Sequence, residues 1–330
     1  MTTVLRLTPD RPEPDAIAAA AARLRDGGLV AFPTETVYGL GVAALDAAAV
    51  RRLFAAKGRP ADDPLIVHVA DASGLAALVA ERPAVVDALA ARFWPGPLTI
   101  VLRRSPLVPD EVTAGLDTVA VRVPAHPVAH ALLTAAGIPV AAPSANLFSR
   151  PSPTRAAHVL EDLDGRIDMV LDAGPTQVGV ESTVLDLSGG AAVVLRPGAV
   201  TLEMLRPLLP DVRRRGATAA EGPQPSPGLL AKHYSPRAPL TLYEGPLDRV
   251  VDRVRADAAA AEAAGRRVGV LVPDDDAAVM AARLYAALRE FDAAGVDEIL
   301  ARLPPTRDGL SDAVADRLRR AAAGRIVRCG

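Results

Sequence analysis

Residues 15–36 read DAIAAAAARLRDGGLVAFPTET, an alanine-rich run followed by a short bulky apolar stretch. The first part has the composition and spacing of a helix, and Asp26-Gly27-Gly28 is typical of a helix end. Residues 29–32 then predict a buried strand that stops at Pro33. A helix that leads into a buried strand with polar groups at its end is the building unit of an α/β sheet.

The same alternation continues along the chain. Further helices are expected over residues 46–56, 82–93, 127–136 and 154–163, with Asp46 and Thr154 as N-caps. Strands are expected over residues 65–69, 98–102, 119–123, 138–142, 169–172, 183–187 and 192–195. The fold class is therefore α/β.

A proline- and glycine-rich stretch between residues 207 and 239 interrupts this pattern and predicts a linker. Beyond it, strands over 240–243, 268–272 and around 299 alternate with helices over 247–264, 277–293 and 312–323. The predicted organisation is a large α/β domain over residues 10–200, a linker over 201–238 and a smaller Rossmann-like α/β domain over 239–330.

Composition excludes several classes of protein. Half of the 330 residues are hydrophobic and 23% are charged, which favours a packed globular chain over a disordered one. No apolar run is long enough to span a bilayer, and charges and prolines replace a signal peptide's apolar segment, so we expect a cytoplasmic protein without membrane contact. The single cysteine, Cys329, excludes an internal disulfide and a cysteine-rich zinc site. A net charge of −2 and 3% aromatic residues argue against tight direct RNA binding.

Three residues are conspicuous because their types are rare here. Lys57 and Lys232 are the two lysines in a chain rich in arginine, and Asn146 is the single asparagine. Ammonium and amide groups have chemistry that guanidinium and carboxylate groups do not copy. Each of the three lies in a segment punctuated by glycine, proline or serine, which is typical of functional loops. The alternative for any one of these three residues is that it occurs at its position by chance.

The segment KGRPADDPL, residues 57–65, places Lys57 and Arg59 two positions apart beside Asp62 and Asp63. Two cations restrained by glycine and proline suit a polyphosphate with its magnesium ion. A solvated surface turn is the alternative. By contrast, the G-x-G-x-x-A match over residues 39–44 is accidental, because its glycines do not open a helix as a dinucleotide-binding turn requires.

Two charged or titratable residues interrupt apolar strands, His68 in LIVHV and Arg122 in VAVRV. A buried charge needs a partner, and for Arg122 either the carboxylate of a small ligand or an internal Asp or Glu would serve. His126 and His130 share a helical spacing, but without a third ligand a core or surface role is favoured over a metal site.

Several motifs occur together in order: FPTETVYGL (32–40), KGRPADDPLIVH (57–68), WPGPLT (94–99), VAVRVP (119–124) and APSAN (142–146). With this set the chain resembles the threonylcarbamoyl-AMP synthase family, which has the YrdC-like fold. Ser182-Thr183 and LRPG (195–198) extend the resemblance, and SPG (226–228) with KHYSP (232–236) is similar to the linker of the two-domain long form. The resemblance implies a YrdC-like twisted mixed sheet with flanking helices for the large domain.

The resemblance also implies a reaction. A member of the family condenses L-threonine, bicarbonate or CO2 and ATP to threonylcarbamoyl-adenylate and pyrophosphate. A downstream tRNA threonylcarbamoyl-transferase complex then modifies an adenosine beside the anticodon. Magnesium is the implied cofactor, held mainly by the ATP phosphates, and we expect a monomer. A non-catalytic RNA-binding or ribosome-maturation protein is the alternative function, and an accessory domain for carbamoyl phosphate chemistry is a third.

Residue roles carried over from the family fall into two sets. The residues implied to bind L-threonine are Thr36, His68, Arg122, Ala142 and Ser182. Those implied to bind ATP are Lys57, Arg59, Asp63, Thr118, Ser144, Asn146, Ser152, Arg196 and Tyr234, with Lys57, Arg59, Ser144 and Asn146 as the catalytic group. Tyr234 would fold over the nucleotide as part of a lid. At Asp63 the family often has asparagine, and a carboxylate would repel phosphates unless a cation bridges them.

Overall fold

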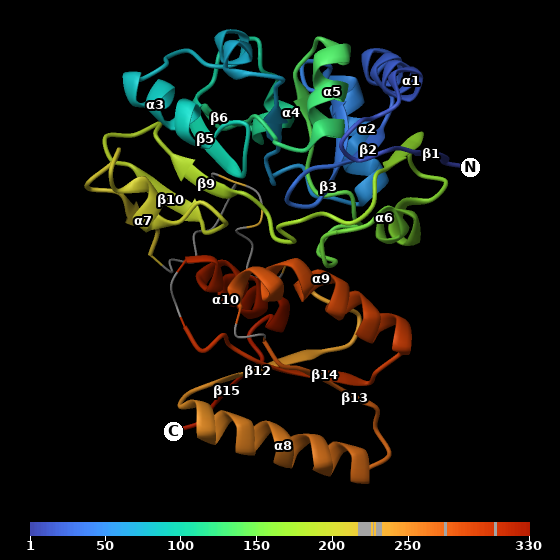
Figure 1. Ribbon diagram of the computed structural model, residues 1–330, viewed down its shortest axis with the longest axis vertical. Coiled ribbons are helices and arrows are strands. Elements are labelled where there is room, and N and C mark those ends of the chain that lie inside the picture. Colours follow the sequence, from blue (N-terminus) through green and yellow to red (C-terminus); the bar gives the residue numbers. More distant parts are fainter. Residues whose placement is uncertain (217–225, 227, 229–232, 274–275, 307–308) are drawn as a thin grey trace.

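A computed structural model describes residues 1–216, 226, 228, 233–273, 276–306 and 309–330. Its strands form two sheets (Figure 1). The larger sheet contains β1 (Thr3–Arg6), β2 (Val30–Pro33), β3 (Tyr38–Ala43), β4 (Ile66–His68), β5 (Leu98–Arg103), β6 (Thr118–Arg122), β7 (Val140–Ala141), β8 (Met169–Asp172), β9 (Thr183–Asp186), β10 (Val193–Arg196) and β11 (Arg213–Arg214). Their order is β1-β8-β2-β3-β7-β4-β6-β5-β9-β10-β11. Parallel and antiparallel pairs both occur, which confirms the mixed sheet.

Helices cover the larger sheet: α1 (Pro14–Arg25), α2 (Ala47–Lys57), α3 (Ala84–Phe93), α4 (Asp110–Thr113), α5 (Pro127–Ala136), α6 (Ala156–Leu163), α7 (Leu202–Leu205) and the 3-10 helix η1 (Ala72–Ala77). Capping follows the sequence at α2, where the Asp46 side chain accepts from the Ala49 N–H and Gly58 ends the helix with a φ of 61°. The prediction that Thr154 caps α6 is wrong, because Arg155 is the N-cap and makes no side-chain cap bond. His126 caps α5 with Nδ1, which gives this histidine a structural role.

Four of the described strands were not expected from the sequence: β1, β3, β11 and β15 (Ile326–Arg328). The two glycines of β3 concealed it, although one of them, Gly41, is required for the strand to fit. A Cβ on Gly41 would lie 2.7 Å from the Phe32 ring and 2.9 Å from Val140 Cγ1. The G-x-G-x-x-A match begins inside this strand, as expected of an accidental match. β1 lies before residue 10, and α7 and β11 lie within the stretch expected to be linker.

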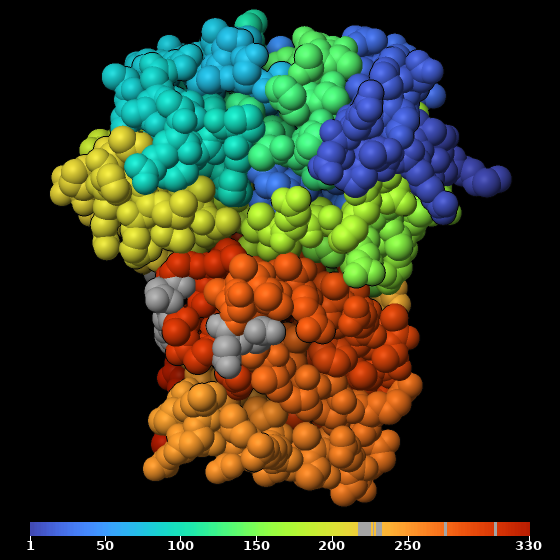
Figure 2. Space-filling view, in the orientation of Figure 1, coloured from blue at the N-terminus to red at the C-terminus, as the bar shows by residue number. Residues whose placement is uncertain are grey.

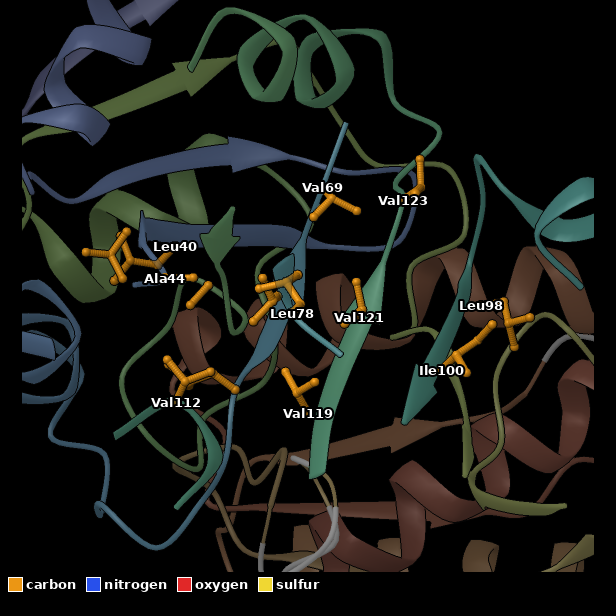
Figure 3. Packing of buried hydrophobic residues seen from close by; sticks show 14 of the residues in the cluster. Leu40, Ala44, Val69, Leu78, Leu98, Ile100, Val112, Val119, Val121 and Val123 are labelled. Carbon is orange, nitrogen blue, oxygen red and sulfur yellow. The ribbon is translucent and has the colours of Figure 1, made fainter. Parts of the chain in front are cut away.

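Strand β6 shows why the sheet is buried on both faces. Val119, Val121 and Val123 belong to the largest apolar cluster together with Leu98 and Ile100 of β5 (Figure 3). Ala120 packs in a separate cluster on the other face. A strand covered on both faces has no outward polar positions, so Arg122 at its end is buried as well.

The C-terminal unit has a sheet in which every pair is parallel. Its strands β12 (Leu240–Glu244), β13 (Val268–Leu271), β14 (Glu298–Arg302) and β15 lie in the order β13-β14-β12-β15. Helix α8 (Leu247–Ala263) covers one face, whereas α9 (Ala277–Ala294) and α10 (Gly309–Ala322) cover the other and face the larger unit (Figure 1). This arrangement confirms the predicted smaller α/β domain.

The two units are packed together directly (Figure 2). Val37 and Val180 of the larger unit share an apolar cluster with Ala281 and Leu284 of α9. Contact is so close at Gly179 that a Cβ there would lie 2.4 Å from the Ala281 carbonyl oxygen. Among the described helices, none combines the length and apolar character that a membrane crossing requires.

Candidate active site

A pocket lies where several strands of the larger sheet end, and residues of the larger unit and of the segment that precedes the C-terminal unit line it. Its lining contains Thr34, Thr36, Val37, Gly39, Arg59, Ile66, His68, Arg122, Ala142, Pro143, Ser144, Glu181, Ser182, Arg196, Gly228, His233 and Tyr234. The strand ends therefore bring together segments that are up to about 200 residues apart in the sequence, as expected for the ligand site of an open α/β sheet.

All five residues that the family resemblance assigned to L-threonine line this pocket: Thr36, His68, Arg122, Ala142 and Ser182. The sheet explains their proximity. His68 and Arg122 are register partners at the ends of the parallel strands β4 and β6. Ala142 follows β7, which pairs with β4, and Ser182 precedes β9. The convergence is thus a property of strand register and not of loop conformation alone.

Arg122 has an internal partner. Its Nη2 lies 2.8 Å from Glu35 Oε1, and its Nε donates to the Gly96 carbonyl at 3.2 Å. The alternative of an internal carboxylate is therefore realised. Arg122 lines the pocket and Glu35 does not, so the carboxylate supports the guanidinium from outside the pocket wall. The remaining donors of a planar guanidinium suit a ligand carboxylate.

His68 is neutral in this environment. Burial, with a smaller contribution from Arg122, lowers the pKa of His68 to about 3. Its Nδ1 is buried without a hydrogen-bond partner among the described residues. A neutral imidazole beside a guanidinium can form one hydrogen bond with a hydroxyl or amine group of a ligand without adding charge to the pocket.

Four of the residues assigned to ATP line the same pocket: Arg59, Ser144, Arg196 and Tyr234. Asp63 is buried and faces Arg59, with 2.9 Å between Asp63 Oδ2 and Arg59 Nη2. Arg59 also donates to the Asp63 carbonyl and to the Pro64 carbonyl, so one short segment fixes its side chain. The turn at residues 60–62 is exposed, but the charged side chains of Lys57, Arg59 and Asp63 are buried.

Lys57 lies beneath the pocket wall. Its Nζ donates to the carbonyls of Ser144 and Asn146 at 2.5 Å each, and the Phe148 N–H donates back to the Lys57 carbonyl. Burial, followed by the neighbouring Arg59, lowers the pKa of Lys57. Asn146 donates to the Leu147 and Arg150 carbonyls. The two rare residues together hold the loop that presents Ser144.

Two further residues of the ATP set lie outside the pocket lining. Ser152 is fully buried and donates to Glu181 Oε1 at 2.5 Å. Thr118 begins β6, opposite Arg103 of β5, at the end of the strand away from Arg122. Lys232 lies outside the described residues.

Sequence reasoning missed several residues around the pocket: Glu35, Glu181, His233, Tyr285 and Arg317. Glu181 lines the pocket and immediately precedes Ser182, so its position in the sequence was a usable signal. Its carboxylate accepts from Tyr285 and Arg317 of the C-terminal unit. Burial opposes ionisation of Glu181, but Arg317 and Arg196 prevail and lower its pKa to about 2. No local pattern indicated the partners, which lie 104 and 136 residues away.

The low pKa of Glu181 predicts a specific acid response. A carboxyl whose pKa falls from 4.5 to about 2 on folding stabilises the fold above pH 4.5, and this stabilisation is lost as pH falls towards 2. The shift corresponds to roughly 3 kcal/mol. We expect Glu181→Gln to lower the free energy of unfolding at pH 6, and the difference from the parent protein to shrink between pH 5 and pH 2. Urea unfolding at several pH values measures this, and a pH-independent difference would contradict it.

Comparisons with known proteins agree with this geometry. A family model described as "Telomere recombination" matches residues 22–198. A second, described as "Threonylcarbamoyl-AMP synthase, C-terminal domain", matches residues 200–323. The threonylcarbamoyl-AMP synthase of Pyrococcus abyssi is 44% identical, covering 99% of this chain and 100% of that protein. That of Bacillus subtilis is 46% identical, covering 94% of both.

The structural comparison spans both units. The crystal structure of P. abyssi Sua5 complexed with L-threonine is 44% identical and superposes with a TM-score of 0.95 over 100% of both chains. A P. abyssi Sua5 variant in which a consecutive histidine and tyrosine are replaced by alanine superposes with a TM-score of 0.94, covering 99% of this chain and 98% of that one.

Proposed function

The chain belongs to the threonylcarbamoyl-AMP synthase family and is a nucleotidyl-transferring enzyme, and on that premise we propose how its pocket binds the substrates. L-Threonine occupies the side formed by Thr36, His68, Arg122 and Ser182, and ATP the side formed by Arg59, Ser144, Arg196 and Tyr234. The observation that carries this assignment is that all five residues of the threonine set and four residues of the ATP set line one pocket, in a fold that superposes on the L-threonine complex of a relative.

The proposed reaction has two steps. The amine of L-threonine takes up bicarbonate to give a carbamate and water. A carbamate oxygen then attacks the α-phosphorus of ATP, the bond to the β-phosphate oxygen breaks, and pyrophosphate leaves. Arg122 binds the threonine carboxylate and fixes the amine, while Arg59 and Arg196 stabilise the negative charge on the phosphates. Catalysis on this proposal is positioning and charge stabilisation.

Magnesium enters this proposal as part of the nucleotide. Asp63 is the buried acidic side chain of the segment 57–65, and it faces Arg59 at 2.9 Å. The ion pair supports the proposal that the ATP phosphates hold the ion and that Asp63 positions Arg59. The ion pair also reduces the repulsion expected between the Asp63 carboxylate and the ATP phosphates, because Arg59 compensates the charge of Asp63.

The wider setting is also a proposal. The adenylate is a reactive mixed anhydride, so we expect a separate tRNA threonylcarbamoyl-transferase complex to consume it in the cytoplasm, where ATP is available. We propose that the enzyme acts as a monomer because the larger unit and the segment that carries Tyr234 line the pocket within one chain. A non-catalytic RNA-binding function is not favoured, since nearly the full chain matches synthases.

The direct test is pyrophosphate release from ATP with magnesium and bicarbonate, with and without L-threonine, coupled to mass detection of the adenylate. The proposal expects release that depends on threonine and a product with the mass of threonylcarbamoyl-AMP. Folded protein that releases no pyrophosphate under these conditions would overturn it. Replacing L-threonine by L-valine, which has a methyl group in place of the hydroxyl, is the matched substrate control.

Removing the chain after Pro207 is expected to reduce this activity at least ~10-fold. The truncation removes Tyr234 from the pocket lining, so water is no longer excluded from the reacting groups. Pyrophosphate release by the truncated and full-length proteins measures the effect. Tyr234→Ala in the full-length chain serves as the companion variant, since it keeps the C-terminal unit. Full activity in the truncated protein would mean that the linker is only a tether.

A further inference from the structure

A fully buried arginine of the C-terminal unit, Arg317, contacts segments of the larger unit that carry pocket residues. Arg317 of α10 donates from Nε to Glu181 Oε2 and from Nη1 to the Pro197 carbonyl, at 2.9 Å each. Both acceptors belong to the larger unit. An arginine without exposed surface that donates to two separate segments of the neighbouring unit fixes their relative position.

Those two segments carry pocket residues. Glu181 precedes Ser182, and Pro197 follows Arg196. Arg196 in turn donates from Nε to the Ser182 carbonyl at 3.1 Å and from Nη2 to Ser182 Oγ at 3.2 Å. Arg317 therefore supports the place where Arg196 and Ser182 meet, through the residues next to each of them.

Tyr285 of α9 makes a second connection. Its hydroxyl lies 3.0 and 2.9 Å from the two oxygens of Glu181, and its ring stacks on Tyr234 at 5.5 Å between centroids with 30° between the planes. The Arg317 guanidinium lies 5.5 Å from the centre of the same Tyr234 ring. Tyr234 has a φ of 59°, a left-handed conformation that a tyrosine adopts only when its surroundings enforce it.

We propose that Tyr285 and Arg317 are positioning residues of the C-terminal unit, which hold Glu181, the Arg196–Pro197 segment and the Tyr234 ring in the arrangement that binds ATP. This inference deepens the proposed function and rests on it. Of the groups held, Arg196, Tyr234 and Ser152, which donates to Glu181, belong to the proposed ATP side. Ser182 alone belongs to the threonine side, and its hydroxyl is also within 2.7 Å of Thr99 Oγ1 in the larger unit.

The inference predicts an asymmetric kinetic effect. Loss of a Tyr285 or Arg317 contact should weaken ATP binding and leave L-threonine binding nearly unchanged. If these contacts only stabilised the packing of the two units, their loss would lower the melting temperature and weaken the binding of both substrates alike. The ratio of the two KM changes therefore separates positioning from general stabilisation.

Tyr285→Phe is the principal variant because it keeps the ring that stacks on Tyr234 and removes only the hydroxyl. Its matched control is Tyr243→Phe, which removes a hydroxyl that donates to Asp257 within the C-terminal unit. We expect KM for ATP to rise about 5-fold in Tyr285→Phe, the effect of one hydrogen bond, with KM for L-threonine within about 2-fold of the parent. Tyr243→Phe should leave both values unchanged.

Arg317→Met tests the stronger contact, with Arg319→Met as its control, since Arg319 on the same helix pairs with Glu244 inside the C-terminal unit. We expect KM for ATP to rise about 10- to 100-fold in Arg317→Met, and Arg317→Lys, which keeps the charge, to recover part of the loss. Should Arg317→Met not fold, Tyr285→Phe and Arg317→Lys carry the test.

Calorimetric titration with a non-hydrolysable ATP analogue provides a readout that does not need turnover. Weaker analogue binding by Tyr285→Phe than by Tyr243→Phe is the expected result. The inference would be overturned if Tyr285→Phe and Arg317→Lys bound the analogue with affinities within 2-fold of the control variants Tyr243→Phe and Arg319→Met. Equal increases in KM for ATP and L-threonine, accompanied by a lower melting temperature, would also overturn it. Failure of the proposed function would appear separately, as parent protein that binds the analogue but forms no adenylate.

Discussion

Replacing Arg122 with alanine should lower kcat/KM for L-threonine at least ~100-fold, because the side chain assigned to the substrate carboxylate is lost. The loss should be larger for kcat/KM than for kcat. Arg122 lines the pocket and is only 4% exposed, so water cannot easily take over its role towards a carboxylate. Pyrophosphate release as a function of L-threonine concentration measures the change.

The variant also tests the Glu35 pair. Removing one partner of a buried ion pair leaves an uncompensated charge, which costs about 3–5 kcal/mol. Arg122→Ala should therefore unfold at a lower temperature than the parent, and Arg122→Met with Glu35→Gln should recover stability without recovering activity. This double variant separates loss of the substrate contact from loss of the fold. Turnover near the parent level in the folded double variant would remove Arg122 from substrate binding.

The sequence alone was sufficient for the elements with strong local signals. The apolar strands, the Asp46 cap, the Gly58 end of α2 and the smaller α/β unit all occur as predicted. A charged or titratable residue inside an apolar strand indicated Arg122 and His68, and both of these residues line the pocket. The match of motifs in order then supplied roles that spacing could not.

What escaped prediction depends on contacts between distant segments. Glu35 lies 87 positions from Arg122, and Arg317 lies 136 from Glu181, so nothing in a local window pairs them. Strand β3 was missed because glycine is a poor strand former, and Gly41 is explained only by the Phe32 and Val140 side chains that pack on it. Lys57 was expected on the phosphates, whereas its contacts are with backbone carbonyls under the loop.

Replacing Lys57 with methionine is expected to lower kcat at least ~100-fold. Methionine keeps most of the apolar stem and removes the ammonium group that donates to the Ser144 and Asn146 carbonyls. The buried Asn146 carbonyl then loses the ammonium donor, the Ser144 carbonyl keeps only the Asn146 N–H, and the loop that presents Ser144 is no longer fixed. A small displacement of positioning groups is enough to reduce turnover by orders of magnitude, since catalysis on the proposed mechanism is positioning.

Arg52→Met is the matched control, because Arg52 lies on the same helix and also donates to a backbone carbonyl, that of Gly27, which is outside the pocket lining. It should lower stability modestly and keep kcat. Lys57→Arg should not restore the activity of Lys57→Met. A planar guanidinium is too wide for the fully buried site of a compact ammonium with two carbonyls at 2.5 Å. If Lys57→Met keeps both its fold and the parent kcat, the contacts beneath the loop are not needed for catalysis, and the pocket must fix Ser144 by other means.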